Sequence, residues 1–387
     1  EFIDPFFEAL GWDVGNKEGI AEQYKEVIHE DSIIVGNSKK APDYCFRVGS
    51  ERKFFVEAKK PAVNISKDVD SAFQLRRYGW SAKLGLSILT NFKEISVYDC
   101  RVKPKQNDKA STARIMHFSF EELDEKWSEL EDIFSKDAVW KGSFDKFSSI
   151  SGKKRGTTTV DDDFLKQLEG WRASLAKNLV KLNKNINQRD LNYSVQRTID
   201  RILFLRISED RGLENDAQLQ SLLSKKNIYK GLCELFLIAD EKYNSGLFHF
   251  HKENDRPEPP DELSLKLNID DKTLKEIFEN LYYPNCPYEF SVMPAEILGQ
   301  VYEQFLGKYI KVTSSKRVTI EEKPIVKKAG GVFYTPAYIV NEIVIETIAP
   351  LLKNSTPLKV SRLKFVDPAC GSGSFLIGVY DYILNWH

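Results

Sequence analysis

The feature that most restricts the fold is a repeated change of hydrophobic period between residues 32 and 99. Apolar residues at alternate positions predict short β-strands at 32–35, 43–48, 53–58, 85–90 and 94–98. Before the fourth of these strands, apolar residues at three- and four-residue intervals predict a helix at 68–82. Turn-forming residues at 49–52 predict an antiparallel hairpin. The sequence therefore predicts a compact mixed α/β unit.

The middle of the chain has a helical period instead. After a predicted helix at 120–135, the segment 148–159 is rich in Ser, Gly, Lys and Thr, which is typical of a flexible connection. Beyond it we expect an all-helical region, with helices at 161–183, 190–213, 216–223, 229–243, 271–281 and 294–310. Near residue 330 the pattern changes again, to a helix at 336–352, an apolar strand at 363–366 and a glycine-rich turn.

Composition argues against a disulfide-rich secreted protein and against a membrane-spanning protein, and the charge balance limits how nucleic acid could be bound. The 56 Lys and Arg residues nearly balance 57 Asp and Glu residues, so any contact with nucleic acid must come from local basic groups. Candidates for phosphate contacts are Arg76, Arg77, Lys83 and residues 153–155, and the alternative for each is an ordinary solvated surface position. The five cysteines are an odd number without paired spacing, which predicts reduced thiols and a cytoplasmic protein. No apolar run reaches the roughly 18 residues of a membrane span.

Three polar residues on the predicted hairpin form a candidate catalytic group. Asp43 opens one strand, and Glu57 and Lys59 lie two apart on the next, so alternation places Glu57 and Lys59 on one face. Two carboxylates can hold a magnesium ion, which neutralises phosphate charge and lowers the pKa of bound water. An adjacent lysine can orient that water or stabilise the transition state. The alternative is that all three are ordinary exposed charges.

These residues also resemble a known motif. Pro42-Asp43, followed after thirteen residues by Glu57-Ala58-Lys59, resembles the PD-(D/E)xK nuclease motif. Residues 74–78 resemble the QxxxY motif of related restriction and recombination nucleases. The resemblance implies a Mg2+-dependent endonuclease with a mixed sheet. The catalytic residues that it implies are Asp43, Glu57, Lys59, Gln74 and Tyr78. The metal ligands that it implies are Asp43, Glu57 and the carbonyl of Ala58.

Three acidic residues of the first predicted helices are further candidate metal ligands, namely Glu8, Glu22 and Glu26. The simpler interpretation is that they belong to a solvated face, because a lone surface carboxylate is seldom a ligand.

A second pair of segments carries a different resemblance. G-V-F-Y-T-P at 331–336 and D-P-A-C-G-S-G-S-F at 367–375 resemble motifs X and I of N6-adenine DNA methyltransferases. Gly371 and Gly373 permit a tight turn between the apolar strand and a helix that begins near Ser374. The resemblance implies a class I (Rossmann-like) domain that binds S-adenosylmethionine. The cofactor-binding residues that it implies are Thr335, Pro336, Asp367, Pro368, Ala369, Gly371 and Gly373. The alternative is a turn without a ligand.

Within that resemblance, Asp367 lies near the methionine part of the cofactor, and Thr335 is expected to cap a helix whose first residue is Pro336. Cys370 is expected to be a small packed residue, because adenine methylation uses no enzyme thiol. The Asn/Asp-Pro-Pro-Tyr/Phe segment that grips the flipped adenine in this family is absent. We therefore expect this chain not to methylate DNA, and its one strand and one helix not to close the cofactor pocket by themselves.

The order of the parts resembles type IIG restriction-modification enzymes, in which one polypeptide cuts and methylates double-stranded DNA. We expect an endonuclease domain at 1–136, a linker at 137–160, a helical connector at 161–325 and an incomplete methyltransferase domain at 326–387. Connector segments 200–204, 209–213 and 296–303 resemble phrases of these enzymes, although each can be an amphipathic core helix. No G-x-x-x-x-G-K-[ST] loop occurs, so an ATP motor is not expected.

Several points complete this interpretation. One nuclease site cuts one strand, so we expect transient dimerisation on DNA. The first residue is not Met and the last lies in an apolar segment, so we expect both ends to be trimmed. Two alternatives remain, a methyltransferase-only phage-defence protein with a non-catalytic nuclease-like domain, and an interaction scaffold.

Overall fold

A computed structural model describes residues 2–21, 24–29, 34–35, 38–39, 41–49, 51–151, 158–243, 245–252, 259–313, 315–328 and 334–387. The chain divides into two compact units. The N-terminal unit comprises Glu1–Val160 with Ser194–Met293, and the C-terminal unit comprises Asp161–Tyr193 with Pro294–His387. Each unit is described by itself. The domain boundaries expected from the sequence stay predictions.

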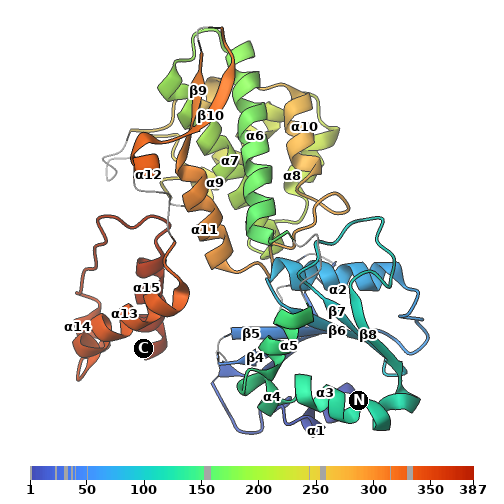
Figure 1. The fold of residues 1–387 in the computed structure, drawn as a ribbon. Coiled ribbons are helices and arrows are strands. Elements are labelled where there is room, and N and C mark those ends of the chain that lie inside the picture. Colours follow the sequence, from blue (N-terminus) through green and yellow to red (C-terminus); the bar gives the residue numbers. More distant parts are fainter. Residues whose placement is uncertain are drawn as a thin grey trace. The chain divides into compact units, whose positions relative to one another are not determined.

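The N-terminal unit is built on a six-stranded mixed sheet with the order β1-β4-β5-β6-β7-β8 (Figure 1). The strands are β1 (Val27–His29), β4 (Tyr44–Val48), β5 (Glu51–Ala58), β6 (Leu86–Thr90), β7 (Glu94–Asp99) and β8 (Arg114–Ser119). All neighbours are antiparallel except β5 and β6. That parallel pair is connected by the helix α2 (Val69–Ser81), as a crossover requires. The predicted mixed α/β unit and the β4–β5 hairpin are confirmed.

The predicted strand at 32–35 is described only in part. Ile34–Val35 forms β2, which pairs with β3 (Ser38–Lys39), whereas residues 32 and 33 lie outside the described residues.

The sheet carries an apolar core on each face. Phe54 packs with Phe7 and Phe134 on one face, which is covered by α1 (Ile3–Ala9), α3 (Leu123–Phe134), α4 (Lys136–Trp140) and α5 (Ser143–Ser151). Phe55 packs with Leu75 of α2 on the other face. Because both Phe54 and Phe55 are fully buried, β5 is covered on both sides. The strand β5, which carries Glu57, is therefore packed on both faces of the sheet and paired with β4 and β6 along its edges.

The helical part of the N-terminal unit includes the later portion of α7 (Gln188–Asp210), which crosses the division between the units. The remaining elements are α8 (Gln218–Ser221), α9 (Ile228–Lys242), α10 (Asp271–Glu279) and short 3-10 helices η2 (Phe120–Glu122), η3 (Leu222–Ser224) and η4 (Ser264–Lys266). Segment 200–204 belongs largely to the core, where Arg201 is buried. In segment 209–213, Glu209 and Asp210 are buried, whereas Leu213 is exposed.

A segment after α10, residues 282–293, fastens this helical part to the sheet. The Arg77 guanidinium of α2 donates to the Tyr288 carbonyl and pairs with Glu289 at 2.8 Å. Trp80 stacks on the Tyr288 ring with centroids 5.7 Å apart. Arg52 of β5 donates to the Val292 carbonyl. The segment therefore covers α2 through buried, directional contacts.

These contacts correct the expectation of phosphate binding by two arginines of α2. Arg76 is 1% exposed and pairs with Asp108 at 2.7 Å, while Arg77 pairs with the buried Glu289. Both guanidinium groups are used inside the protein, because a buried cation needs a partner. Lys83 is exposed, and residues 153–155 lie outside the described residues.

The C-terminal unit is mainly helical. Its elements are α6 (Val160–Leu182), α11 (Ala295–Leu306), β9 (Lys308–Val312), β10 (Val318–Glu322), α12 (Pro324–Lys328), α13 (Ala337–Leu352), α14 (Pro357–Val360) and α15 (Ser374–Trp386). Arg172 of α6 donates to the Phe305 carbonyl of α11, and its guanidinium lies 3.4 Å from the Phe305 ring centre. Within its apolar cluster, α13 packs Val340 and Val344 against α15.

Two expectations for this unit are wrong. The region expected to be all-helical contains the antiparallel hairpin β9–β10, because residues 308–312 alternate in polarity and the helix ends at Leu306. Residues 363–367 do not form a strand, and Val366 is 89% exposed. A parallel strand needs hydrogen-bonded neighbours, and the described residues pair none with this segment.

Two further observations concern the whole described chain. No helix among the described residues is both long and apolar enough to cross a bilayer. All five cysteines are free thiols. Cys370 is exposed, so the expectation that it is packed is wrong, since no sheet covers the turn that carries it.

Candidate functional site

The β4–β5 hairpin brings two carboxylates together. Tyr44 pairs with Val56 at the end of the ladder, so Asp43 and Glu57 follow as neighbours on adjacent strands. The Ala58 backbone N–H donates to Asp43 Oδ2 at 2.8 Å. The Asp43 side chain therefore takes the place of a strand partner where the ladder ends, which fixes its carboxylate beside β5.

A chain of polar contacts continues from Glu57. The Lys59 Nζ lies 2.7 Å from Glu57 Oε1 and 3.4 Å from Gln74 Oε1. The Gln74 Nε2 in turn donates to the Tyr78 hydroxyl at 3.2 Å. The Lys59 N–H donates to the Thr90 carbonyl of β6, which fixes the backbone of the lysine. The structure thus brings together the five residues that the sequence predicted as catalytic.

Glu57 is the most unusual group of the cluster. It is 3% exposed, so the interpretation of this residue as an ordinary exposed charge is wrong. Burial raises the pKa of its carboxyl, the nearby Asp43 charge raises it further, and the Lys59 hydrogen bond opposes both. Among the described residues, its Oε2 has no hydrogen-bond partner. A buried carboxylate oxygen without a partner is costly, and a cation would satisfy it.

The donor set is therefore compatible with a divalent ion. Asp43 and Glu57 provide carboxylate oxygens of the kind that hard cations prefer. In the part of the chain that the structure describes, no group of three or more His, Cys, Asp or Glu side chains could hold a metal. A further ligand would have to be a carbonyl, such as that of Ala58, or water.

The three acidic candidates from the first helices do not gain support. Glu8 pairs with Lys17, and Glu26 pairs with Lys136 and accepts from the Asp13 N–H. Glu22 lies outside the described residues. The simpler interpretation therefore holds for Glu8, which remains a surface ion pair.

Glu289, which lies near the cluster of Asp43, Glu57 and Lys59, could not be predicted from the sequence. Burial raises the pKa of the Tyr78 hydroxyl, and the negative charge of Glu289 contributes to that rise. Glu289 is 3% exposed and is held by Arg77 and Ser291. It is separated from Tyr78 by more than two hundred residues, and no local pattern marks it.

The glycine-rich turn has the predicted local geometry. Gly371 and Gly373 have φ angles of +54° and +82°, where a side chain would be strained. The Asp367 carboxylate accepts from the Ala369 N–H at 3.0 Å, and α15 begins at Ser374 as expected. This turn closes on itself without a paired strand before it.

The helix start after motif X differs from the expectation. Pro336 has a ψ angle of 144° and caps α13, which begins at Ala337. Thr335 is therefore not the N-cap, because the extended ψ of Pro336 places the helix start one residue later. Residues 331–333 lie outside the described residues.

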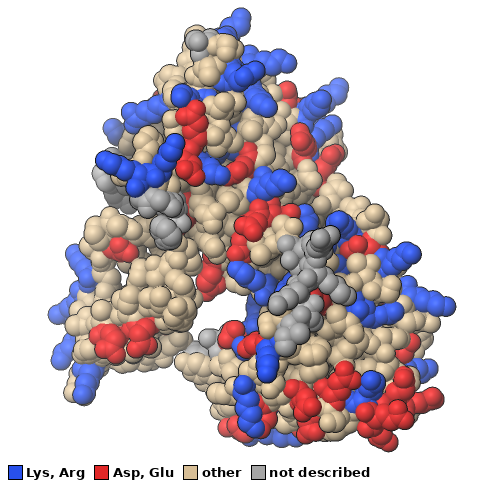
Figure 2. Space-filling model, viewed as in Figure 1, with Lys and Arg blue, Asp and Glu red and all other residues tan. Residues whose placement is uncertain are grey.

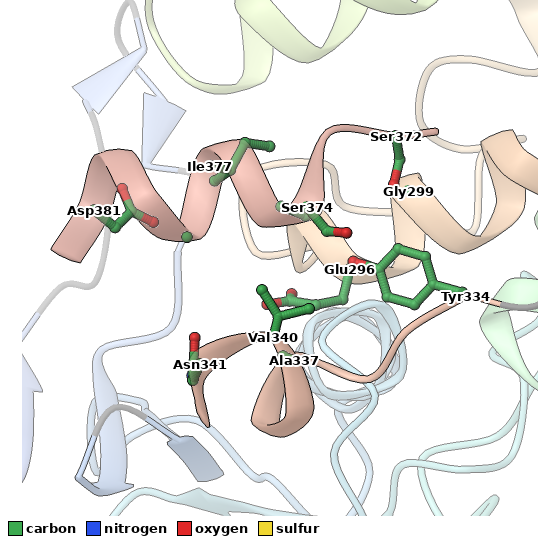
Figure 3. Close-up of a pocket in the computed structure, with 12 residues that line it drawn as sticks. Glu296, Gly299, Tyr334, Ala337, Val340, Asn341, Ser372, Ser374, Ile377 and Asp381 are labelled. Carbon is green, nitrogen blue, oxygen red and sulfur yellow. The ribbon is translucent and has the colours of Figure 1, made fainter. Parts of the chain in front are cut away.

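A small pocket of about 110 Å³ lies beside the turn (Figure 3). Figure 3 shows Glu296 of α11 beside the ring of Tyr334. The pocket is lined by Ala295, Glu296, Gly299, Tyr334, Ala337, Val340, Asn341, Ser372, Ser374, Ile377, Gly378 and Asp381. Several of them neighbour the predicted cofactor residues, but the volume is below the roughly 300 Å³ of a ligand pocket. The expectation that this chain does not close the cofactor pocket by itself stays a prediction.

The contribution of α11 to this pocket was not predicted. Residues 296–303 were singled out only as a phrase of restriction-modification enzymes, and their helical period indicated a core helix. The signal was present in Gly299, since a glycine inside a helix costs stability and often marks a close approach.

Charge on the surface is mixed. On the face that Figure 2 shows, Lys and Arg side chains lie among Asp and Glu side chains in the described parts of the chain. This agrees with the near balance of 56 basic and 57 acidic residues.

Comparison with known proteins finds similarity to restriction and modification proteins. Residues 294–386 match the family model N-6 DNA Methylase. The chain is 37% identical over 385 residues to the Type II restriction enzyme and methyltransferase RM.Eco57I of Escherichia coli, which covers 99% of this chain and 37% of the relative. The chain therefore spans a little over a third of that relative.

A solved structure, the type IIG restriction endonuclease BpuSI, aligns with 97% of this chain and 36% of its own length, at 16% identity and a TM-score of 0.27. A likeness at that level carries no argument about the fold. The sequence comparison is stronger: nearly the whole chain is similar to part of a type II restriction enzyme and methyltransferase, and residues 294–386 match the N-6 DNA Methylase family model.

Proposed function

We propose that this chain is part of a type IIG restriction-modification enzyme. Its N-terminal site cleaves double-stranded DNA with Mg2+, and its C-terminal segment belongs to an S-adenosylmethionine-dependent N6-adenine methyltransferase. The observation that carries the proposal is the convergence of Asp43, Glu57 and Lys59 at the end of the β4–β5 hairpin. Sequence identity to a restriction and methylation protein along nearly the whole chain supports it.

In this mechanism Asp43 and Glu57 hold the metal ion, and the Ala58 carbonyl supplies a further oxygen. When bound, the ion lowers the pKa of a coordinated water and neutralises charge on the scissile phosphate. Glu57 Oε2, which has no hydrogen-bond partner among the described residues, is the oxygen that would coordinate the ion. The Asp43 carboxylate is oriented by the Ala58 N–H, so the ligand needs no rearrangement.

Lys59 acts on the water or on the phosphate. Its ammonium group is held between Glu57 and Gln74, so its position is fixed from two sides. Gln74 is oriented by the Tyr78 hydroxyl on the same face of α2. Gln74 and Tyr78 are therefore positioning residues, which hold the ammonium group toward the substrate.

The whole reaction requires more than one such site. One metal-carboxylate cluster hydrolyses one phosphodiester, so a double-strand break needs two copies, which we assign to transient dimerisation on DNA. Cleavage is then positioned by a recognition element outside the residues described.

The test is plasmid cleavage by the complete protein. Supercoiled plasmid is incubated with Mg2+ and with wild type, Asp43→Ala or Lys59→Ala, with EDTA as a metal-free control. We expect both variants to lose roughly a hundredfold or more of the cleavage rate, as for loss of a catalytic acid, base or ligand. Lys60→Ala is the matched control, because Lys60 is the exposed next residue. Undiminished cleavage by Asp43→Ala or Lys59→Ala refutes the assignment.

The second candidate function is a methyltransferase-only defence protein whose nuclease-like domain is inert. It predicts DNA binding without any metal-dependent nicking by the wild type. The cluster of Asp43, Glu57, Lys59 and Gln74 favours the nuclease over this alternative, because it keeps both the carboxylates and the lysine that cleavage needs.

A further inference from the structure

Helix α11 presents one face to the glycine-rich turn. Glu296, Gly299 and Glu303 are spaced by three and four residues, so they lie on the same side of the helix. The Glu303 Oε1 accepts from the Ser372 N–H at 3.2 Å and from the Ser372 hydroxyl at 3.1 Å. Ser372 stands between the two glycines of the turn. The carboxylate therefore holds the centre of the turn with two hydrogen bonds.

The two glycines nearest this contact make the approach possible. A Cβ at Gly299 would lie 3.0 Å from the Tyr334 ring and 3.4 Å from the Ser372 Cβ. A Cβ at Gly371 would lie 2.5 Å from Glu303 Oε1, closer than real Cβ contacts allow. Gly371 thus leaves the space that the Glu303 carboxylate fills. A side chain at Gly371 would displace the Glu303 carboxylate from its present position, and one at Gly299 would press on the Tyr334 ring.

Tyr334, from the segment that resembles motif X, lies against the same face of α11. Burial raises the pKa of the Tyr334 hydroxyl, and the negative charges of Glu296 and Glu303 raise it further. Tyr334, Glu296, Gly299 and Ser372 all line the small pocket beside the turn. The methylase family match begins at residue 294, one residue before α11. The helix therefore belongs with the turn and not with the preceding connector.

We propose that Glu303 is a positioning residue of the S-adenosylmethionine site, which fixes the Gly371–Gly373 turn through its two hydrogen bonds to Ser372. The helix α11 is accordingly a wall of the cofactor site. The inference rests on the proposed cofactor use. Without the Glu303 acceptor, the Ser372 N–H loses its partner and the turn is free to leave the conformation in which its backbone approaches the cofactor.

The test is S-adenosylmethionine binding to the complete protein, measured by titration calorimetry. We expect Glu303→Ala to raise the dissociation constant by about tenfold or more, since it removes two hydrogen bonds to a charged acceptor. Glu303→Gln keeps an acceptor oxygen at the same reach, so it should stay within about threefold of wild type. Ser372→Ala removes one of the two bonds and should lie between them. Glu322→Ala, an exposed residue of β10, is the control.

The outcomes separate the two proposals. If the wild type does not bind S-adenosylmethionine, the proposed cofactor use fails, and this inference fails with it. If the wild type binds and Glu303→Ala binds equally well, only this inference is overturned. It is also overturned if Glu303→Gln loses as much affinity as Glu303→Ala, because the effect would then come from charge. Melting temperatures identify any variant that does not fold, and Ser372→Ala then decides.

Discussion

The cluster around Glu57 and the glycine-rich turn at 371–373 each carry a sequence motif next to a predicted strand. They differ in how far the neighbouring chain buries and pairs that strand. Glu57 is 3% exposed on a strand that pairs with β4 and β6, whereas Val366, just before Asp367, is 89% exposed and unpaired among the described residues. A sequence motif specifies which groups a site uses. Neighbouring strands decide whether those groups are desolvated and held in place.

If the site at Glu57 depends on a tightly packed surrounding, the largest loss of unfolding free energy should come from breaking the buried ion pair between Arg77 of α2 and Glu289. Arg77→Ala leaves the Glu289 carboxylate buried without its cation. Removing one partner of a buried ion pair costs about 3 kcal/mol or more of unfolding free energy. Urea unfolding measures the loss, and Lys60→Ala should change little. A loss below about 1 kcal/mol would show that the segment 282–293 does not stabilise α2.

The next effect separates stability from function within the same site. Glu57→Gln should lower the rate of Mg2+-dependent cleavage by roughly a hundredfold, because even indirect partners of a metal ligand contribute ten- to a hundredfold. The same change should not destabilise the metal-free protein at neutral pH, since the glutamine amide oxygen can still accept from Lys59 while the costly buried charge is removed. Plasmid cleavage and urea unfolding are measured on one preparation. A variant that loses both activity and stability contradicts this account.

The glycine-rich turn should respond more weakly to single changes. Gly373→Ala imposes a positive φ on a side chain and should cost about 1–2 kcal/mol, with no neighbour within 4 Å to clash. Gly371→Ala should cost at least as much, because the Glu303 carboxylate must also shift away from the new Cβ. Hydrogen exchange of the first α15 amides in the complete protein measures both. A lower cost for Gly371→Ala than for Gly373→Ala would contradict the contact between Glu303 and the turn.

The smallest effect is a pH dependence. The Glu57 carboxyl keeps its proton above the ordinary pKa of 4.5, so the folded state binds more protons there than the unfolded state does. Its contribution to the stability of the metal-free protein is therefore greatest below that pH and declines as the pH rises through the raised pKa. Glu57→Gln lacks this decline. The stability difference between variant and wild type should grow with pH, and a constant difference would contradict the raised pKa.

Much of the sheet could be predicted because its central strands carry strong local patterns. The segments 43–48, 53–58, 85–90 and 94–98 correspond to β4, β5, β6 and β7. The short β1 and the edge strand β8 were not predicted. Residues of β8 are mostly half-buried, so their polarity does not alternate clearly. Edge strands are specified by the neighbour they pair with, which local periodicity does not contain.

The contacts of the candidate sites can likewise be divided into local ones, which the sequence indicates, and long-range ones, which it does not. Glu57 with Lys59, and Gln74 with Tyr78, were singled out because they resemble nuclease motifs. Strand and helix geometry then places residues two and four apart on one face. The contact between Glu303 and Ser372 spans 69 residues and depends on how a helix packs. Only coordinates reveal such a contact. Sequence motifs therefore recover the parts of a site that share one element or one hairpin.

The bond from the Ala58 N–H to Asp43 also bears on the order of folding. Its two residues are 15 apart and close a single hairpin, whereas the Arg77 to Glu289 pair spans 212 residues. Short loops close with a small entropy loss, and hairpins form within microseconds. Asp43 and Glu57, the two proposed metal ligands, are thus expected to meet early as the polypeptide collapses. A nascent chain can bring them together long before residue 289 has been synthesised.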